Sequence, residues 1–369
     1  MAEYNLAIIA GDGIGIEVME EALKVLSVLE EHENDFKLNI EKFPWNSDYY
    51  LAHGRMMPED GLETLRNFDA ILFGAIGDVR VPDNVTVWEL IMPIRKQFQQ
   101  YVNFRPVKTL PGISSPLRNG ENIDLVIFRE NSEGEYSDSG GRLFESQSTE
   151  LAVQNTIMTR AGIEKITRAA CEYAVSTGRK KVTSATKSNA VTHALKLWDE
   201  HVKRVVTEEF SELEFESNYI DALVAYFVQR PQSFEVVVAS NLFGDILSDL
   251  GSGIVGGLGL SPSANINPER NYPSMFEPVH GSAPDIAGKG IANPIAQIWS
   301  AALMMEHLGR RDLSLKIVQA IEEVLFEKKV ITADIGGNAT TSQMGSAIME
   351  KIKEQYITEK MGSLIHGTN

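Results

Sequence analysis

The chain contains one cysteine, Cys171, among its 369 residues. A single cysteine excludes an internal disulfide bond and any zinc site that is built from several cysteines. Cys171 stands among apolar residues in a segment with helical spacing, and a free cysteine in such a place is usually an inert part of the core. We therefore expect Cys171 to be structural and the chemistry to lie with other side chains.

A long apolar run and a basic N-terminal segment are also missing. The longest uncharged stretch, residues 250–268, is rich in glycine, serine, asparagine and proline, so it is not a membrane-spanning helix. The chain starts Met-Ala-Glu-Tyr, which lacks the features of a signal peptide. Together with the single cysteine, these absences predict a protein of the reduced cytoplasm.

Positive charge is scarce, with 34 Lys and Arg against 51 Asp and Glu and a net charge of −17. A surface of this sign repels nucleic-acid phosphates and anionic lipids, so neither nucleic acid nor a membrane surface is an expected partner. A small anionic substrate can still bind where arginines are gathered locally.

Short apolar runs alternate along the chain with segments of helical periodicity. This alternation is typical of an α/β fold in which helices connect parallel strands. The predicted strands are residues 6–10, 36–40, 70–73, 124–128, 181–185 and 234–239. The predicted helices are residues 18–29, 88–100, 160–177, 190–203, 244–253, 294–308 and 313–326. No linker or repeat marks a domain boundary, and the segments 105–120 and 251–259, rich in Pro or Gly, are the candidate crossing points.

The glycine-rich turn Gly11–Gly15 follows a predicted strand and precedes a predicted helix. The dinucleotide fingerprint G-x-G-x-x-G requires a glycine at position 16, where this chain has Ile16. A standard Rossmann pyrophosphate site is therefore not supported.

Three arginines stand where α/β proteins bind anionic ligands. Arg129 ends an apolar strand, Arg105 precedes Pro106, and Arg95 lies on a predicted helix. A guanidinium at the carboxyl end of a strand faces the ligand crevice, and three such groups can hold two carboxylates bidentately. Taken singly, each also fits an ordinary surface arginine.

Asp245 and Asp249 share one face of a predicted helix because they are four residues apart. Their mutual repulsion would be relieved by a hard divalent ion such as Mg²⁺ or Mn²⁺. An acidic first helical turn, stabilised by the helix dipole, explains the same pattern without a metal. Lys187, Tyr136 and Asp221 also lie in or beside apolar segments, where a polar group usually has a partner or a function. Spacing alone leaves these alternatives open.

Taken together, these segments resemble the β-decarboxylating dehydrogenase family, which includes isocitrate, isopropylmalate, tartrate and D-malate dehydrogenases. The similarity extends over nearly the whole chain. The motifs that carry it are Gly11–Glu17, Ile94–Lys96, Asn103–Pro106, Phe128–Asn131, Asn241–Asp249 and Glu277–Asp285. The last two are long and specific.

The resemblance implies an isopropylmalate dehydrogenase-like α/β fold, with two domains around one large mixed sheet, and not a Rossmann fold. The large cofactor-binding domain would combine residues 1–102 with residues 256–369. Residues 103–255 would form the smaller domain, with the substrate and metal residues and the dimer interface. Family members are homodimers whose active sites use both chains.

By matching positions, the resemblance implies a clamp for the substrate's carboxylates at Arg95, Arg105 and Arg129. It implies a Mg²⁺ or Mn²⁺ site formed by Asp245 and Asp249 together with Asp221 of the second chain. It also implies an acid–base pair, Tyr136 and Lys187, with the lysine again from the second chain. Lys187 would take the hydroxyl proton, and Tyr136 would return a proton to the enol.

The resemblance further implies an adenosine-binding loop at His280, Gly281, Ser282, Ala283 and Asp285, with Asn293 further along the chain. Members that use NADP carry a lysine and a tyrosine where this chain has Asp285 and Ile286. A carboxylate at position 285 would accept hydrogen bonds from ribose hydroxyls and repel a 2′-phosphate, so we expect NAD. K⁺ is an additional candidate cofactor.

The family's substrates share a D-malate core and differ at C3, which should meet the turn before Arg95. The segment Val81–Met92, with its Pro-Asp…Trp pattern, is most similar to the D-malate and tartrate branch. We therefore predict oxidative decarboxylation of D-malate to pyruvate and CO₂, with related oxidation of tartrate and with Trp88 narrowing the C3 pocket. One alternative is a 3-isopropylmalate dehydrogenase. Another is a catalytically silent regulatory subunit, although the positions that such subunits tend to lose are intact here.

Overall fold

Adjacent residues of each central strand pack into two different cores, so helices cover both faces of one sheet. In β1 (Ala2–Gly11), Leu6 and Ile8 pack with α1 (Ile14–His32) in one hydrophobic cluster. Ala7 and Ile9 belong to a second cluster, which includes residues of α3 (Gly61–Leu65) and α5 (Met92–Gln97).

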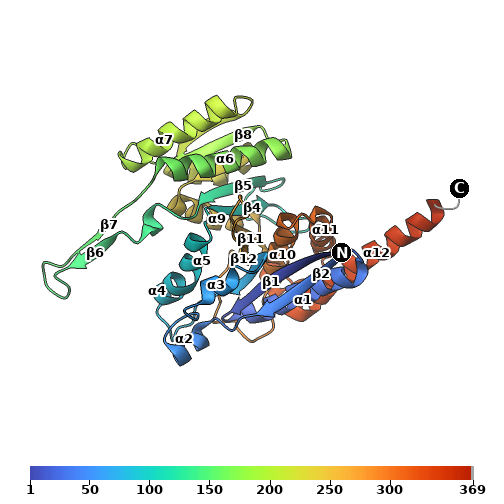
Figure 1. Cartoon of the computed structure of the whole chain (residues 1–369). Helices are drawn as coiled ribbons and strands as arrows, with labels where there is room; N and C mark the ends of the chain where they lie inside the picture. Colours follow the sequence, from blue (N-terminus) through green and yellow to red (C-terminus); the bar gives the residue numbers. More distant parts are fainter. Residues whose placement is uncertain (367–369) are drawn as a thin grey trace.

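The computed structural model describes residues 1–366, with side chains through residue 360. Its main sheet has ten strands in the order β2-β1-β3-β12-β11-β4-β5-β10-β8-β9 (Figure 1). The remaining strands are β2 (Phe36–Lys42), β3 (Ala70–Ala75), β4 (Val102–Lys108), β5 (Asp124–Glu130), β8 (Lys181–Thr186), β9 (Glu214–Tyr219), β10 (Val236–Ala239), β11 (Pro262–Ile266) and β12 (Ser274–Pro278). The sheet is mixed because β11 pairs antiparallel with β12 and β4, and β4 pairs antiparallel with β5.

The other helices of four or more residues, in chain order, are α2 (Ser47–His53), α4 (Asp83–Thr86), α6 (Arg160–Thr177), α7 (Ala194–Arg204), α8 (Ile220–Gln229), α9 (Asn241–Val255), α10 (Ile295–His307), α11 (Arg311–Glu327) and α12 (Thr341–His366). Two π-helical turns, Val87–Ile91 and Val205–Glu209, continue α4 and α7. A separate hairpin, β6 (Gly140–Leu143) with β7 (Leu151–Gln154), extends away from the body of the chain (Figure 1).

The six predicted strands all form, and the predicted large mixed sheet is confirmed. The prediction of parallel connections holds on both flanks of the sheet and is wrong in its middle, where β4 and β11 run antiparallel to their neighbours. The predicted helix 88–100 is wrong at both ends. Helical structure starts at Asp83, directly after Pro82, and ends at Gln97 because Gln99 has a left-handed backbone with φ of 49°.

The middle of the chain supplies its own pair of cores. In β5, Val126 and Phe128 pack with α6 and α7, whereas Leu125 and Ile127 pack with α8 and α9. The division into residues 1–102 plus 256–369 and residues 103–255 stays a prediction, and residues 367–369 lie outside the described part. Among the described residues, no helix is both long and apolar enough to cross a membrane.

Cys171 is fully buried on α6, inside the cluster that packs on β5. Burial raises the pKa of its thiol to about 12, so the thiolate is not formed at neutral pH. The predicted structural role is confirmed.

Candidate active site

The three predicted arginines come together from three different elements. Arg95 lies on α5, Arg105 on β4 and Arg129 near the carboxyl end of β5. Their side chains are almost fully buried, with 11%, 8% and 4% of their surface exposed. Burial, and the positive charge of Arg105 and then Arg95, lower the pKa of Arg129 to about 10, which leaves it charged at neutral pH.

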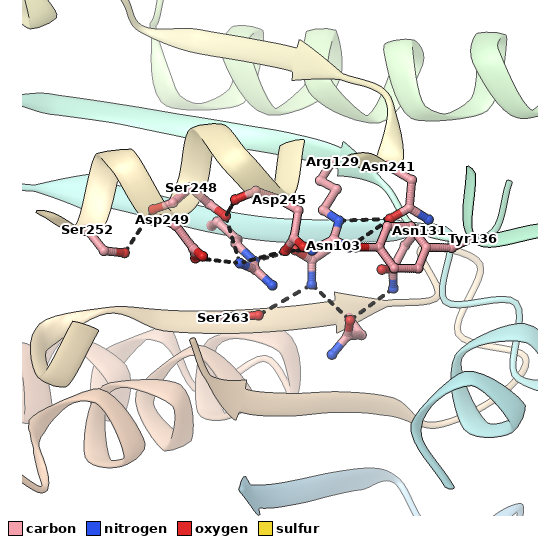
Figure 2. A network of polar contacts seen from close by, with 12 residues as sticks. Asn103, Arg129, Asn131, Tyr136, Asn241, Asp245, Ser248, Asp249, Ser252 and Ser263 are labelled. Atoms are coloured by element: carbon pink, nitrogen blue, oxygen red, sulfur yellow. Dashed lines mark hydrogen bonds and ion pairs between the residues drawn. The ribbon is translucent and has the colours of Figure 1, made fainter. Parts of the chain in front are cut away.

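Asp245 and Asp249 approach these arginines from α9 (Figure 2). Arg129 forms an ion pair with Asp245, and the guanidinium of Arg105 lies 3.6 Å from Asp245 and 3.8 Å from Asp249. The close approach depends on Gly244, because a Cβ atom there would lie 2.5 Å from the Arg129 side chain. The helix that carries the acids can therefore pack directly on the strand that carries the arginine.

The two carboxyl groups differ in their electrostatics. Burial opposes ionisation of Asp245, but the charges of Arg129 and Arg105 and a hydrogen bond from Tyr136 outweigh it, so its pKa lies below the ordinary value. Burial raises the pKa of Asp249, to which neighbouring Asp245 adds, and Arg105 offsets only part of the effect. Asp249 is thus the carboxylate whose charge is less well compensated.

Tyr136 joins this group from a short 3₁₀ turn, Glu135–Ser137. Its hydroxyl donates a hydrogen bond of 3.2 Å to Oδ2 of Asp245, and the guanidinium of Arg129 lies 5.5 Å from the centre of its ring. Burial, followed by the charge of Asp245, raises the pKa of Tyr136, so the phenol keeps its proton at neutral pH. It can act as a proton donor in this position.

Lys187 and Asp221 lie elsewhere and pair with each other. Nζ of Lys187, just after β8, donates a hydrogen bond of 2.6 Å to Oδ1 of Asp221 in the first turn of α8. The Asp221 side chain is 66% exposed, and the hydrogen bond from Lys187 lowers its pKa. Within the described residues, no group of three potential metal ligands forms, so Asp221 does not complete a site with Asp245 and Asp249 in the same chain.

Trp88 lies in the π-helical turn that leads into α5. Its indole is half-buried, and Nζ of Lys96 lies 4.8 Å from the centre of the ring. Trp88 therefore lies in the turn before Arg95, as predicted from the sequence. The role of Trp88 in the C3 pocket stays a prediction.

The glycine-rich turn after β1 packs against the loop that contains the predicted adenosine site. The backbone N–H of Ile14 donates to the carbonyl of Ser282 over 2.9 Å. A Cβ atom at Gly13, whose φ is 56°, would lie 2.1 Å from that carbonyl oxygen. The glycine therefore allows two backbones to touch, which explains a glycine motif without a Rossmann fold.

Polar groups of this loop remain available to a ligand. Nδ1 of His280 lies 2.9 Å from the carbonyl of Gly281, while Nε2 is buried without a hydrogen-bond partner among the described residues. Gly281 and Asp285 are exposed, whereas Ser282 is buried and Ala283 is half-buried with a left-handed φ of 43°. An orphaned buried nitrogen in the same loop as an exposed carboxylate fits a polar ligand such as a nucleoside.

Asn293 is fixed at the start of α10 by its own hydrogen bonds. Its Oδ1 accepts from the N–H of Ile295 over 3.0 Å, and its Nδ2 donates over 3.0 Å to Asp334. Sequence reasoning missed Asp334, which is exposed at the edge of the same loop region. The sequence around Asp334, between Thr332 and Gly336, shows neither helix nor strand periodicity, which indicates a loop but not a function.

Sequence reasoning also missed a set of buried polar residues that surround the arginines: Asn103, Asn131, Ser248, Asn265 and Glu277. Asn103 shares a face of β4 with Arg105, two residues later, but this spacing is a signal only once the strand is known, and β4 was not among the predicted strands. Four of the five lie within the motifs quoted above, and Asn265 lies outside them.

Comparison with known proteins agrees with this geometry. The sequence model for isocitrate/isopropylmalate dehydrogenase matches residues 5–348. The chain is 48% identical to a "Probable tartrate dehydrogenase/decarboxylase" of Bacillus subtilis (strain 168), over 96% of this chain and 99% of that protein. It is also 48% identical to the D-malate dehydrogenase [decarboxylating] of Escherichia coli (strain K12), over 95% and 99% of the two chains. The crystal structure of isocitrate dehydrogenase from Methylococcus capsulatus is similar with a TM-score of 0.85 and 33% identity, over 95% of this chain and 99% of that chain.

Proposed function

The chain belongs to the isocitrate/isopropylmalate dehydrogenase family, and we propose that it catalyses the NAD- and Mn²⁺- or Mg²⁺-dependent oxidative decarboxylation of D-malate to pyruvate and CO₂, with related oxidation of tartrate. One observation carries the substrate class: three buried arginines converge on one site in a chain with a net charge of −17. The chain is 48% identical in sequence to a tartrate dehydrogenase and to a D-malate dehydrogenase over nearly its full length, which favours this branch of the family.

The arginines differ in how far their charges are already used. Arg95 pairs with Glu277 at 2.7 Å, and Arg129 pairs with Asp245. Arg105 donates instead to two neutral oxygens, Oδ1 of Asn103 and Oγ of Ser248, both over 2.6 Å. Because its acidic neighbours are 3.6 Å away or more, Arg105 is the guanidinium with most capacity for a substrate carboxylate.

The residues present fit a hard divalent cation in part. Asp245 and Asp249 supply carboxylate oxygens, the ligand type that Mg²⁺ and Mn²⁺ prefer, and Asp221 of a second chain would supply a third. When bound, such an ion polarises a hydroxyl oxygen and stabilises the charge of an enolate. Arg95, Arg105 and Arg129 would orient the substrate's carboxylates. Lys187 of the second chain would accept the hydroxyl proton through water or through Asp221, and Tyr136 would return a proton to the enol.

The loop around His280 fits the adenosine part of NAD. The nicotinamide part of NAD would be the hydride acceptor. The exposed carboxylate of Asp285 would accept hydrogen bonds from the ribose and disfavour a 2′-phosphate. The unpartnered Nε2 of His280 supports a ligand in this loop.

Exposed apolar side chains support the homodimer. On the β6–β7 hairpin, Leu143, Phe144 and Val153 are exposed by 57%, 55% and 49%. Ile246 on α9 and Val228 on α8 are also exposed, by 48% and 47%. A two-stranded hairpin is marginally stable by itself, so a second copy that covers it would stabilise both.

The first test is the initial rate of NADH formation with D-malate, L-tartrate and 3-isopropylmalate. Each substrate is assayed with Mn²⁺ and with a chelator, and with NAD and then NADP. Metal-dependent turnover of D-malate or tartrate with NAD is expected. A preference for 3-isopropylmalate would retain the chemistry and reject the substrate, and no turnover of any of the three would reject the proposed function.

A further inference from the structure

We propose that Asn265 is the hub of a buried hydrogen-bond relay that positions Arg95 and Arg105 relative to each other before substrate binds, with a branch to the segment that follows Arg129. The inference rests on the proposed function, because it assigns these arginines to substrate carboxylates. It adds positioning residues that do not themselves touch the substrate.

The relay links two of the arginines through side chains alone. Nε of Arg105 donates to Oδ1 of Asn103 over 2.6 Å, and Nδ2 of Asn103 donates to Oδ1 of Asn265 over 2.9 Å. Nδ2 of Asn265 donates to Oε1 of Glu277 over 2.7 Å, and the same oxygen accepts from Arg95 over 2.7 Å. An unbroken chain therefore joins two guanidinium groups from α5 and β4.

A branch reaches the strand of the third arginine. Nδ2 of Asn131, two residues after Arg129, donates to Oδ1 of Asn265 and to the carbonyl of Gln100, each over 2.9 Å. The N–H of Gln100 in turn donates to the carbonyl of Arg95 over 2.9 Å. Asn265 on β11 is thus tied to each of the three segments that carry an arginine.

The direction of the relay follows from the chemistry of its ends. Arginine only donates, so the oxygen of the Asn103 amide must face Arg105 and its NH₂ group must face Asn265. Asn265 then accepts with its oxygen and presents its own NH₂ group to the carboxylate of Glu277. An asparagine at position 265 satisfies both neighbours in one orientation, which neither an apolar residue nor an ionised acid does.

The surroundings exclude water as a substitute. Asn103 and Asn265 have no exposed surface, and Asn131 is 1% exposed. A buried amide that loses its partner cannot turn to solvent, so the relay holds the arginines in one arrangement. Binding sites that are arranged in advance lose less conformational freedom when the ligand binds, which raises affinity. In catalysis, misplacement of a reacting group by about 1 Å can cost roughly 100-fold in rate.

The test is calorimetric titration of D-malate into the full chain with Mn²⁺, in the wild type and in N265L. Leucine has the same number and branching of side-chain heavy atoms and no hydrogen-bonding group. We expect N265L to weaken D-malate binding by roughly 10- to 100-fold. The matched control is N267L, because Asn267 is also fully buried near the end of β11 but bonds to Gln99 and Asn271, outside the relay. N267L should bind D-malate within about twofold of the wild type.

A second variant provides a readout that loss of packing would not produce. In N265D the introduced carboxyl faces Glu277 on β12, with Arg95 on α5 and Arg105 on β4 as the charged groups nearest the relay. When protonated, this carboxyl donates to Glu277 and accepts from Asn103 and Asn131, as the amide does. The ratio of N265D to wild-type affinity should therefore rise as the pH falls from 8 to 5.5.

The possible results separate the two claims. Absence of D-malate binding by the wild type would reject the proposed function and the relay with it. Binding by the wild type that N265L leaves unchanged, or an N265D ratio that does not depend on pH, would reject the relay alone. If N265L fails to fold, as judged by its melting transition, the pH series with N265D decides.

Discussion

The predicted catalytic residues fall into two groups with opposite surroundings. The arginine group, with Asp245 and Tyr136, is largely buried and cross-linked by hydrogen bonds. The second group is the pair Lys187 and Asp221, which is more exposed and bonds within itself. A buried cluster of charge is costly unless something compensates it, whereas a surface ion pair costs and contributes little. The cost of burying the first group therefore indicates a functional site, whereas the second group taken alone gives no such indication.

The difference is explained if the second group belongs to a site on another chain. Lys187 and Asp221 lie just after β8 and at the start of α8. Tyr219, directly before α8, and Val228, near the end of the same helix, are exposed apolar residues. A surface of this kind is a candidate for contact between copies. On this hypothesis each chain contributes the buried half of one site and the exposed half of another.

The largest expected effect comes from breaking the exposed pair. K187M should lower kcat for D-malate by roughly 10²- to 10⁴-fold, because it removes the group proposed to move the hydroxyl proton. Its melting temperature should change little, since an exposed ion pair contributes roughly 0–1 kcal/mol. Initial rates and thermal unfolding of the same preparations check both statements.

The matched control for this variant is K196M, at an exposed lysine on α7. K196M should keep wild-type rates. If K187M also kept them, the exposed pair would have no part in the chemistry, and the comparison of two half-sites would fail.

Co-expression of two inactive variants sharpens the comparison further. K187M damages the exposed half and D249N the buried half, so each homodimer has two damaged sites. In a heterodimer, one site receives both intact halves, and random pairing predicts recovery of roughly one quarter of wild-type activity. Activity is measured on the purified mixture with each variant alone as the reference. No recovery in a mixture that contains heterodimers would place both halves in the same chain.

The sequence predicted the elements whose pattern is local and missed those that depend on distant partners. The helix 160–177 agrees with α6 at both ends, because Thr159 accepts a hydrogen bond from the N–H of Gly162 as its N-cap and Gly178 ends it in a left-handed conformation. Strands β4 and β11 were missed, since Pro106 and the polar Ser263 and Asn265 break an apolar alternation. Their polar side chains make sense only beside the arginines.

The candidate site shows the same division. Motif resemblance pointed to Arg95, Arg105 and Arg129, and the structure brings them together. The role of Asn265 could not be predicted from the sequence, because two of its hydrogen-bond partners lie 12 residues away, at Glu277, and 162 residues away, at Asn103. Long-range pairing of this kind leaves no period in the sequence.

A smaller effect is expected at the edge of the buried group. W88A should enlarge the C3 pocket and shift the ratio of kcat/KM values towards 3-isopropylmalate, relative to D-malate, by roughly 10-fold. The change also removes the ring that Lys96 covers, so K96M serves as the control for loss of that contact. Competition assays with both substrates measure the ratio. An unchanged ratio in W88A would show that Trp88 does not border the C3 group.

The smallest expected effect is on thermal stability, and it has opposite signs for Asp249 of the buried group and Asp221 of the exposed pair. Burial and Asp245 raise the pKa of Asp249 in the folded chain, so its ionised form opposes folding at neutral pH when no metal is bound. D249N should therefore raise the melting temperature of the chelator-treated protein at pH 7, and the gain should shrink as the pH falls towards 4. With 62% of the side chain exposed, solvent screening limits the gain to less than about 0.5 kcal/mol.

Asp221 should behave in the opposite way, because the hydrogen bond from Lys187 lowers its pKa and its charge favours the folded chain above the unfolded pKa. D221N should then slightly lower the melting temperature at pH 7, with the difference lost as the pH falls through the folded pKa. In excess Mn²⁺ we expect D249N to melt below the wild type. The bound ion stabilises the folded wild type by mass action, and D249N lacks a carboxylate to bind it. Differential scanning calorimetry at pH 7 and pH 4.5, in chelator and in excess Mn²⁺, measures the effect of D249N. A further scan at about pH 3, below the ordinary aspartate pKa of 3.8, measures the loss of the D221N effect. A D249N variant that melts below the wild type in chelator would mean that Arg105 compensates Asp249 fully, and that its carboxylate is not held ready for a metal ion.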